Sequence, residues 1–70
     1  MIILKEFKDI RGNKHYVNPQ QVVSIEDTNY WVSERHLDRS IIHTSSYDIT
    51  IDLSPSEIAK KLGIYIDNKG

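Results

Sequence analysis

The chain has 70 residues, of which 39% are hydrophobic; nine basic and ten acidic residues give a formal charge of −1, and there is no cysteine. This length predicts a single domain over residues 1–70, near the size at which one unaided core becomes marginal. Without cysteine there is no disulfide and no thiolate metal site, so self-association is the remaining way to stabilise such a small fold. The balanced charge argues against strong duplex DNA binding and against a basic membrane-surface peptide.

The N-terminal half predicts three strands. Met1 to Leu4 are apolar, but Lys5 and Glu6 end the run before a signal peptide or a membrane span could form, which favours a cytoplasmic protein with no membrane partner. Residues 2–8 loosely alternate and predict a strand that is covered on both faces. Gly12-Asn13 predicts a hairpin turn, with residues 14–17 as the returning strand.

A corner follows, because Asn18-Pro19 interrupts the returning strand. Residues 22–27 then predict a third strand, with Val23 and Ile25 on its half-buried face and Ser24 and Glu26 opposite.

Residues 28–40 match neither the period of a strand nor that of a helix, although Tyr30, Trp31, Val32 and Leu37 supply apolar area. We interpret this segment as an extended hairpin arm or an ordered loop. Because loops on a rigid scaffold often carry function, a binding site is expected here.

The C-terminal part predicts a hairpin and one helix. Residues 41–44 resume β character, residues 45–48 form a polar turn, and residues 49–53 alternate, with Ile49, Ile51 and Leu53 inward. Together with the N-terminal strands, this predicts an α+β fold: a small bent antiparallel sheet of four to five strands with one C-terminal helix.

The helix is expected over residues 55–62, since Ser54 can cap it, Pro55 suits its first position and Glu57 can complete a capping box. Ile58, Ala59 and Leu62 form the stripe that packs on the sheet, and Gly63 ends the helix, with Ile64 in the contact that accompanies such a stop. Residues 64–66 predict either an edge strand or a subunit contact, and residues 67–70 are expected to fray.

The order of these signals resembles the small flagellar FlbD-type proteins and similarly shaped phage proteins. The residues that carry the likeness are Ile3-Leu4, Gly12, Tyr16-Val17-Asn18-Pro19, Val22, Ile25-Glu26 and the Ser54-Pro55-Ser56-Glu57-Ile58 helix start. The resemblance implies a short sheet-plus-helix fold. Residues 28–40 depart from it, because the family has a tight connection at this place.

Familiar catalytic and metal-binding patterns are missing from the sequence. His15, His36 and His43 have neither zinc-ligand spacing nor a cysteine among them, so no metal site is predicted. Ser45 and Ser46 lie beside His43 but without a nucleophile elbow, and hydroxyls in a turn usually bind turn backbone. There is also no glycine-rich phosphate loop. We therefore predict a protein that is not an enzyme and needs no cofactor.

The candidate binding residues are Tyr30, Trp31, Arg35, His36, Arg39 and His43. Arginine and histidine can contact phosphate or carboxylate, and aromatic rings can stack on a base or anchor a protein interface. The alternative is that Trp31 packs on its own sheet while the arginines pair with Glu34 and Asp38.

The preferred function is a non-enzymatic binding module that acts as a homo-oligomer through this aromatic and arginine-rich arm. Two alternatives stay open. One is a phage-type sponge that sequesters a nucleotide signal at a subunit interface, where pockets are common. The other is a small regulator that binds RNA or protein, and steep salt dependence would mark its nucleic-acid form.

Overall fold

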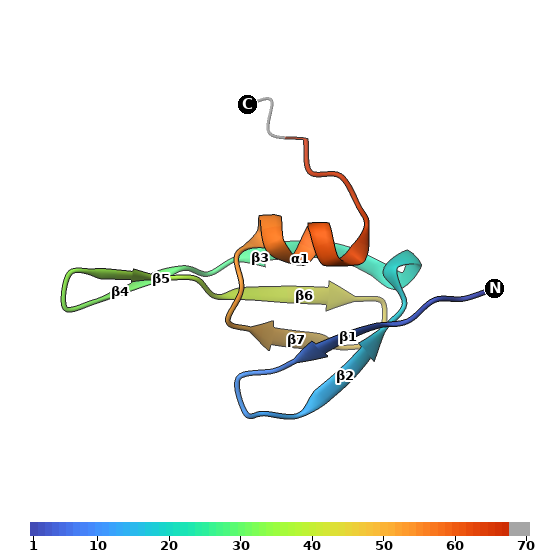
Figure 1. Cartoon of the computed structure of the whole chain (residues 1–70), viewed down its shortest axis with the longest axis horizontal. Helices are drawn as coiled ribbons and strands as arrows, with labels where there is room; N and C mark the ends of the chain where they lie inside the picture. Colours follow the sequence, from blue (N-terminus) through green and yellow to red (C-terminus); the bar gives the residue numbers. More distant parts are fainter. Residues whose placement is uncertain (68–70) are drawn as a thin grey trace.

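The computed structural model describes residues 1–67. Within that range the helix and strands follow in the order β1 (Lys5–Lys8), β2 (Lys14–Val17), a 3-10 turn (Pro19–Gln21), β3 (Val22–Asp27), β4 (Tyr30–Val32), β5 (Arg35–Leu37), β6 (Ser40–Thr44), β7 (Asp48–Ile51) and α1 (Pro55–Leu62). The predicted α+β class, with antiparallel strands and one C-terminal helix, is confirmed (Figure 1).

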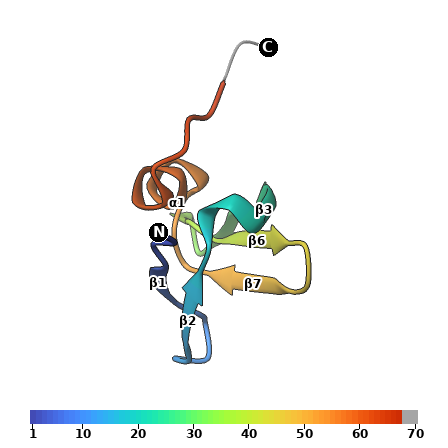
Figure 2. The same cartoon turned by 90° about the vertical axis from the view of Figure 1, so that its right-hand side faces the viewer.

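The expectation of a single sheet of four to five strands is wrong. The described part of the chain has seven strands in three antiparallel sheets: the hairpin β1–β2, the hairpin β4–β5, and a three-stranded sheet in the order β3–β6–β7. The β1–β2 hairpin crosses the three-stranded sheet at a steep angle below the helix (Figure 2). Its turn is tied to β7, because the Ile10 N–H donates to the Thr50 carbonyl oxygen at 3.1 Å.

The first hairpin, the three-stranded sheet and the helix contribute to one core, and the β4–β5 hairpin does not. The buried cluster consists of Phe7, Val17, Ile42, Ile49, Ile51, Ile58 and Leu62. Phe7 and Val17 come from the first hairpin and Ile58 and Leu62 from the helix, so the core is closed by segments from both ends of the chain. The inward positions predicted for Ile49 and Ile51 are confirmed, and Leu53 packs against the same cluster while half-buried.

The predicted inward face of β3 is wrong at one position. Val23 is 71% exposed, whereas Val22 and Ile25 pack against the core. The cause is a register shift: Val22 faces Thr44 and Ser24 faces His43, which places an extra residue in β3. Such a bulge breaks the alternation of faces that the sequence suggests.

The helix begins and ends at the predicted residues, but among the described residues only the serine half of the predicted capping box is formed. The Ser54 hydroxyl oxygen accepts from the Glu57 N–H at 3.3 Å, and Gly63 has φ +76°. The Ile64 N–H donates to the Ala59 carbonyl oxygen at 3.0 Å, and the Gly63 N–H donates to that of Lys60 at 3.2 Å. These two bonds are the Schellman pattern, which satisfies carbonyls that the helix end leaves open.

The ends of the chain differ from the prediction. The first strand begins at Lys5 rather than residue 2, and only Phe7 of that strand is buried, so it is not covered on both faces. Residues 64–66 are not in a strand, and residues 68–70 of the segment expected to fray lie outside the described residues. The structure contains no helix within residues 1–67 that is long and apolar enough to cross a membrane.

Candidate functional site

The β4–β5 hairpin, which we call the arm (residues 30–37), projects from the body of the molecule. In Figure 1 it extends beyond the ends of β3 and β6, and it contributes to the longest dimension of the molecule, 45 Å. The predicted hairpin arm over the middle of the chain is therefore confirmed, and none of its residues belongs to the core cluster.

The root of the arm is clamped where it leaves the three-stranded sheet. The Thr28 N–H and the Thr28 hydroxyl both donate to the Arg39 carbonyl oxygen, at 2.8 and 3.0 Å. Within the same segment, Asp27 Oδ1 accepts from the Asn29 backbone N–H at 3.1 Å and from the Asn29 side-chain amide at 2.9 Å. The bonds between Thr28 and Arg39 therefore join the two chain segments at the root of the arm, and the Asp27 contacts fix the first of these segments locally.

Arg39 adds a side-chain link between the arm and the body. Its Nε donates to Asp52 Oδ1 at 2.8 Å, and its guanidinium carbon lies 4.8 Å from the centre of the Tyr30 ring. The hydrogen bond with Asp52 raises the pKa of Arg39 above its ordinary value, so the group stays charged. Two of the six predicted site residues, Tyr30 and Arg39, therefore have a role in orienting the arm.

Trp31 and His36 form the exposed aromatic face of the arm. They are directly opposite in the β4–β5 register, and their ring centres are 5.2 Å apart with a 55° tilt. Trp31 is 68% exposed, so the alternative in which it packs on its own sheet is wrong. His36 Nδ1 lies 3.9 Å from Asp38 Oδ1, which is a loose contact.

Arg35 occupies the other face of the arm, because it is opposite Val32 and one position away from the Trp31–His36 pair. Neighbouring positions along a strand point to opposite faces. The structure therefore brings Trp31 together with His36, and it places Arg35 on the opposite face of the arm.

The tip of the arm has an unusual backbone. Ser33 and Glu34 both have positive φ, 48° and 68°, and they are the only residues besides glycine with positive φ in the described chain. Two successive residues with positive φ are typical of the type I′ turn, which prefers Asn-Gly. Side chains other than glycine disfavour this region, so the tip carries local strain.

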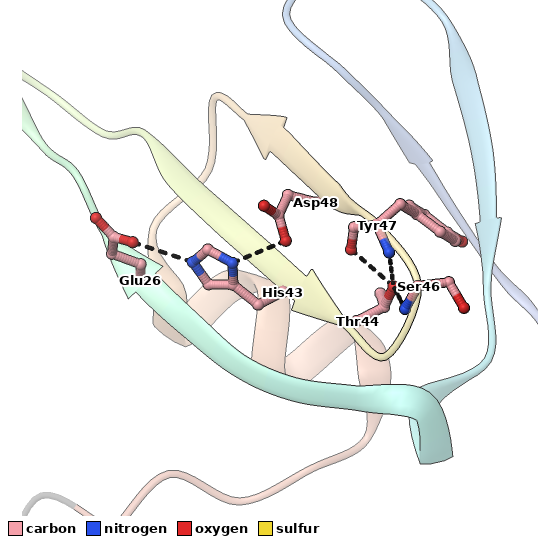
Figure 3. A network of polar contacts seen from close by, with 6 residues as sticks. All are labelled: Glu26, His43, Thr44, Ser46, Tyr47 and Asp48. Carbon is pink, nitrogen blue, oxygen red and sulfur yellow. Dashed lines mark hydrogen bonds and ion pairs between the residues drawn. The ribbon is translucent and has the colours of Figure 1, made fainter.

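His43 lies in a separate cluster on the three-stranded sheet (Figure 3). Its Nε2 is 3.0 Å from Glu26 Oε1 on β3, and its Nδ1 is 2.9 Å from Asp48 Oδ1 on β7. Both carboxylates accept, so both ring nitrogens donate only when the imidazole is protonated. The hydrogen bond with Glu26, followed by that with Asp48, raises the pKa of His43 and favours the imidazolium.

The His43 cluster links the three neighbouring strands β3, β6 and β7. The hydroxyl of the next residue, Thr44, bonds the backbone of the β6–β7 turn. The Thr44 hydroxyl donates to the Tyr47 carbonyl oxygen at 2.7 Å and accepts from the N–H groups of Ser46 and Tyr47 at 3.3 and 3.0 Å (Figure 3). The hydrogen bonds at both ring nitrogens hold the imidazole between β3 and β7. His43 thus lies apart from the arm.

Sequence reasoning missed a second histidine–carboxylate pair in the first hairpin. Asp9 Oδ2 lies 2.7 Å from His15 Nε2, and its Oδ1 accepts from the N–H groups of Arg11 and Asn13, both at 2.9 Å. The hydrogen bond with His15 is the largest of the effects that lower the pKa of Asp9 to about 2. An aspartate that opens a turn ending in Gly-Asn was the available signal, since Asp side chains bind turn amides.

The histidines lie on three different hairpins or sheets, on β2, β5 and β6. Within residues 1–67 no group of three histidine, aspartate or glutamate side chains is arranged to hold a metal ion.

Comparisons with known proteins give no relative: no family model, no curated protein and no solved structure matches this chain. The resemblance to FlbD-type proteins therefore stays a prediction.

Proposed function

We propose that the protein is a non-enzymatic binding module that acts as a homo-oligomer, with the arm as its contact surface. The observation that carries the proposal is Trp31, which is 68% exposed on a hairpin that projects from the body and is clamped at its root. An exposed tryptophan on an oriented support is typical of an interface anchor.

The isolation of the arm supports a partner. A two-stranded hairpin that contacts nothing else is at best marginally stable in water. The arm has only three residues in each strand, pairs with no other strand among the described residues, and has a strained turn. Contact with the arm of a second copy would bury the Trp31 face and add hydrogen-bonding partners for open strand edges.

The geometry favours a protein partner over a nucleotide. A nucleotide site needs a stacking ring beside available cationic groups, whereas the Trp31 ring shares its face of the arm with His36 and has Arg35 on the opposite face. On that opposite face, the guanidinium of Arg39 lies over the Tyr30 ring and is bonded to Asp52. Nucleotide sequestration at a subunit interface presupposes the homo-oligomer.

Sedimentation velocity over a micromolar concentration series tests the proposal. We expect the unaltered protein to self-associate and Trp31→Ala to weaken association by about thirtyfold, the effect of a central aromatic anchor. The matched control is Tyr16→Ala, which removes an exposed aromatic side chain from β2. Circular dichroism checks that both variants fold. A monomer at every concentration, or equal behaviour of the two variants, would refute the proposal.

A further inference from the structure

The N-terminal segment, Met1 to Leu4, exposes four consecutive apolar side chains. Their exposed fractions are 112%, 70%, 58% and 53%, in chain order. Single exposed apolar residues are ordinary, but a continuous run of aliphatic side chains in solvent marks an interaction site. None of the four residues is in a strand, although Ile2, Ile3 and Leu4 directly precede the first residue of β1.

Pro19 explains why this segment is unpaired. The β1–β2 register pairs Lys5 with Val17, and its continuation would set Leu4 against Asn18 and Ile3 against Pro19. Proline has no N–H to donate, and the chain turns into the 3-10 corner at this point. Residues 1–3 instead line a shallow hollow together with the corner residues 18–20, and residues 1–4 pair with no strand.

A groove of about 580 Å³ lies beside the outer edge of β3, between that strand, the start of α1 and the residues after the helix. Its lining is largely apolar and includes Val22, Ile25, Pro55, Ile64 and Ile66, with Asp27 at the end of the strand. It shares no lining residue with the site where the N-terminal segment of the same chain lies.

The wall of this groove is an open strand edge. Within the described residues β3 pairs only with β6, so its outer edge has no partner strand. An extended segment can add to such an edge, where main-chain hydrogen bonds supply affinity and side-chain pockets supply fit.

We propose that residues Met1 to Leu4 of a second copy occupy the groove and extend the β3–β6–β7 sheet. Four extended residues span about 13 Å and the six residues of β3 about 20 Å, so the segment fits along the strand. In antiparallel alignment Met1 comes beside Asp27 and Leu4 beside Ser24. The aliphatic side chains then meet the apolar lining. The exchange is reciprocal, so two copies close into a symmetric dimer.

This contact is independent of the proposed function, because the arm and the N-terminus lie at opposite ends of the molecule (Figure 1). Each contact alone gives a dimer, both together give a larger assembly, and either can fail without the other.

Sedimentation velocity distinguishes the two contacts. We expect Ile3→Asp to weaken association at least about tenfold, both in the unaltered background and in Trp31→Ala. The matched control is Ile10→Asp, which places the same charge on an exposed isoleucine in the first turn. Both sites are exposed in one chain, so both variants should fold. If Ile3→Asp and Ile10→Asp associate equally, the exchange does not occur. If only Trp31→Ala lacks an effect, the proposed function fails and the exchange stands.

Disulfide trapping identifies what occupies the groove, since the chain has no native cysteine. A Leu4→Cys copy is mixed with an isotope-labelled Ser24→Cys copy under a glutathione buffer, because these two positions face each other in the proposed alignment. We expect the mixed dimer to exceed both homodimers in mass spectrometry. The comparison mixture contains Arg35→Cys from the arm with Ser24→Cys. Preferential trapping of the arm, or no preference in either mixture, would overturn the proposal.

Discussion

The strained tip of the arm makes a sharp prediction: the double substitution Ser33→Asn, Glu34→Gly should stabilise the arm. Both positions have positive φ, at 48° and 68°, which is the geometry that Asn-Gly adopts in type I′ turns. An ordinary side chain in this region costs about 1–2 kcal/mol, and Asn and Gly relieve much of that cost. We expect a gain of about 1.5 kcal/mol, or roughly tenfold in the equilibrium between closed and open arm.

Amide hydrogen exchange of the native protein measures this effect, because local opening determines exchange where few buried contacts hold a segment. Protection in β4 and β5 should rise about tenfold, up to the limit set by global unfolding, with a smaller change in β6. The matched control is Ser45→Asn, Ser46→Gly, in a turn whose residues lack positive φ. Unchanged or reduced protection of the arm, or an equal gain in the control, would refute the strain argument.

Three further outcomes follow from the body of the fold. Ile42→Ala should lower the free energy of unfolding by about 3 kcal/mol, since Ile42 is wholly buried in the central strand. The control Val23→Ala, at an exposed position, should change it by less than about 0.5 kcal/mol. Urea denaturation measures both variants, and equal losses would contradict the assignment of Ile42 to the core. Hydrogen bonds with Glu26 and Asp48 raise the pKa of His43 above its ordinary value of 6.5, so its stabilising effect should be complete below pH 6.5 and lost as pH rises through the folded pKa. Urea denaturation at a series of pH values above 6.5 should show the free energy of unfolding falling as pH rises in the unaltered protein, and this fall should be absent in His43→Gln. The pKa of Asp9 is lowered to about 2, so its stabilisation should persist above pH 3.8 and disappear as pH falls toward 2, an acid dependence that Asp9→Asn should lack.

Local signals in the sequence were sufficient for the elements that depend on near neighbours. The helix Pro55–Leu62 begins and ends at the predicted residues, because a serine cap, a proline at the first turn and a glycine at the stop act within a few positions. The first hairpin and the strand Val22–Asp27 were predicted for the same reason, whereas residues 28–40 were interpreted as either a hairpin arm or an ordered loop. Four of the six candidate site residues lie in the arm and Arg39 lies at its root, so the sequence already indicated this segment as a binding site.

The division of the strands into three sheets could not be predicted, since it depends on which distant segments share a core. The same limit applies to Val23, which alternation places inward and the bulge against β6 turns outward. Within the candidate site, composition grouped Trp31 with Arg35, Arg39 and His43. Strand register then separated Arg35 from Trp31, Asp52 engaged Arg39, and two neighbouring strands enclosed His43 between carboxylates.

The local sequence therefore determined the helix, the first hairpin turn and the strand Val22–Asp27, because those choices depend on backbone preferences and on side chains a few residues apart. Long-range pairing decided what the elements leave exposed: an arm with Trp31 outward, an open β3 edge, and an apolar N-terminal segment that Pro19 leaves without a partner. These features arise when segments far apart in sequence compete for the same core and the same hydrogen-bonding edges, which a one-dimensional pattern does not record.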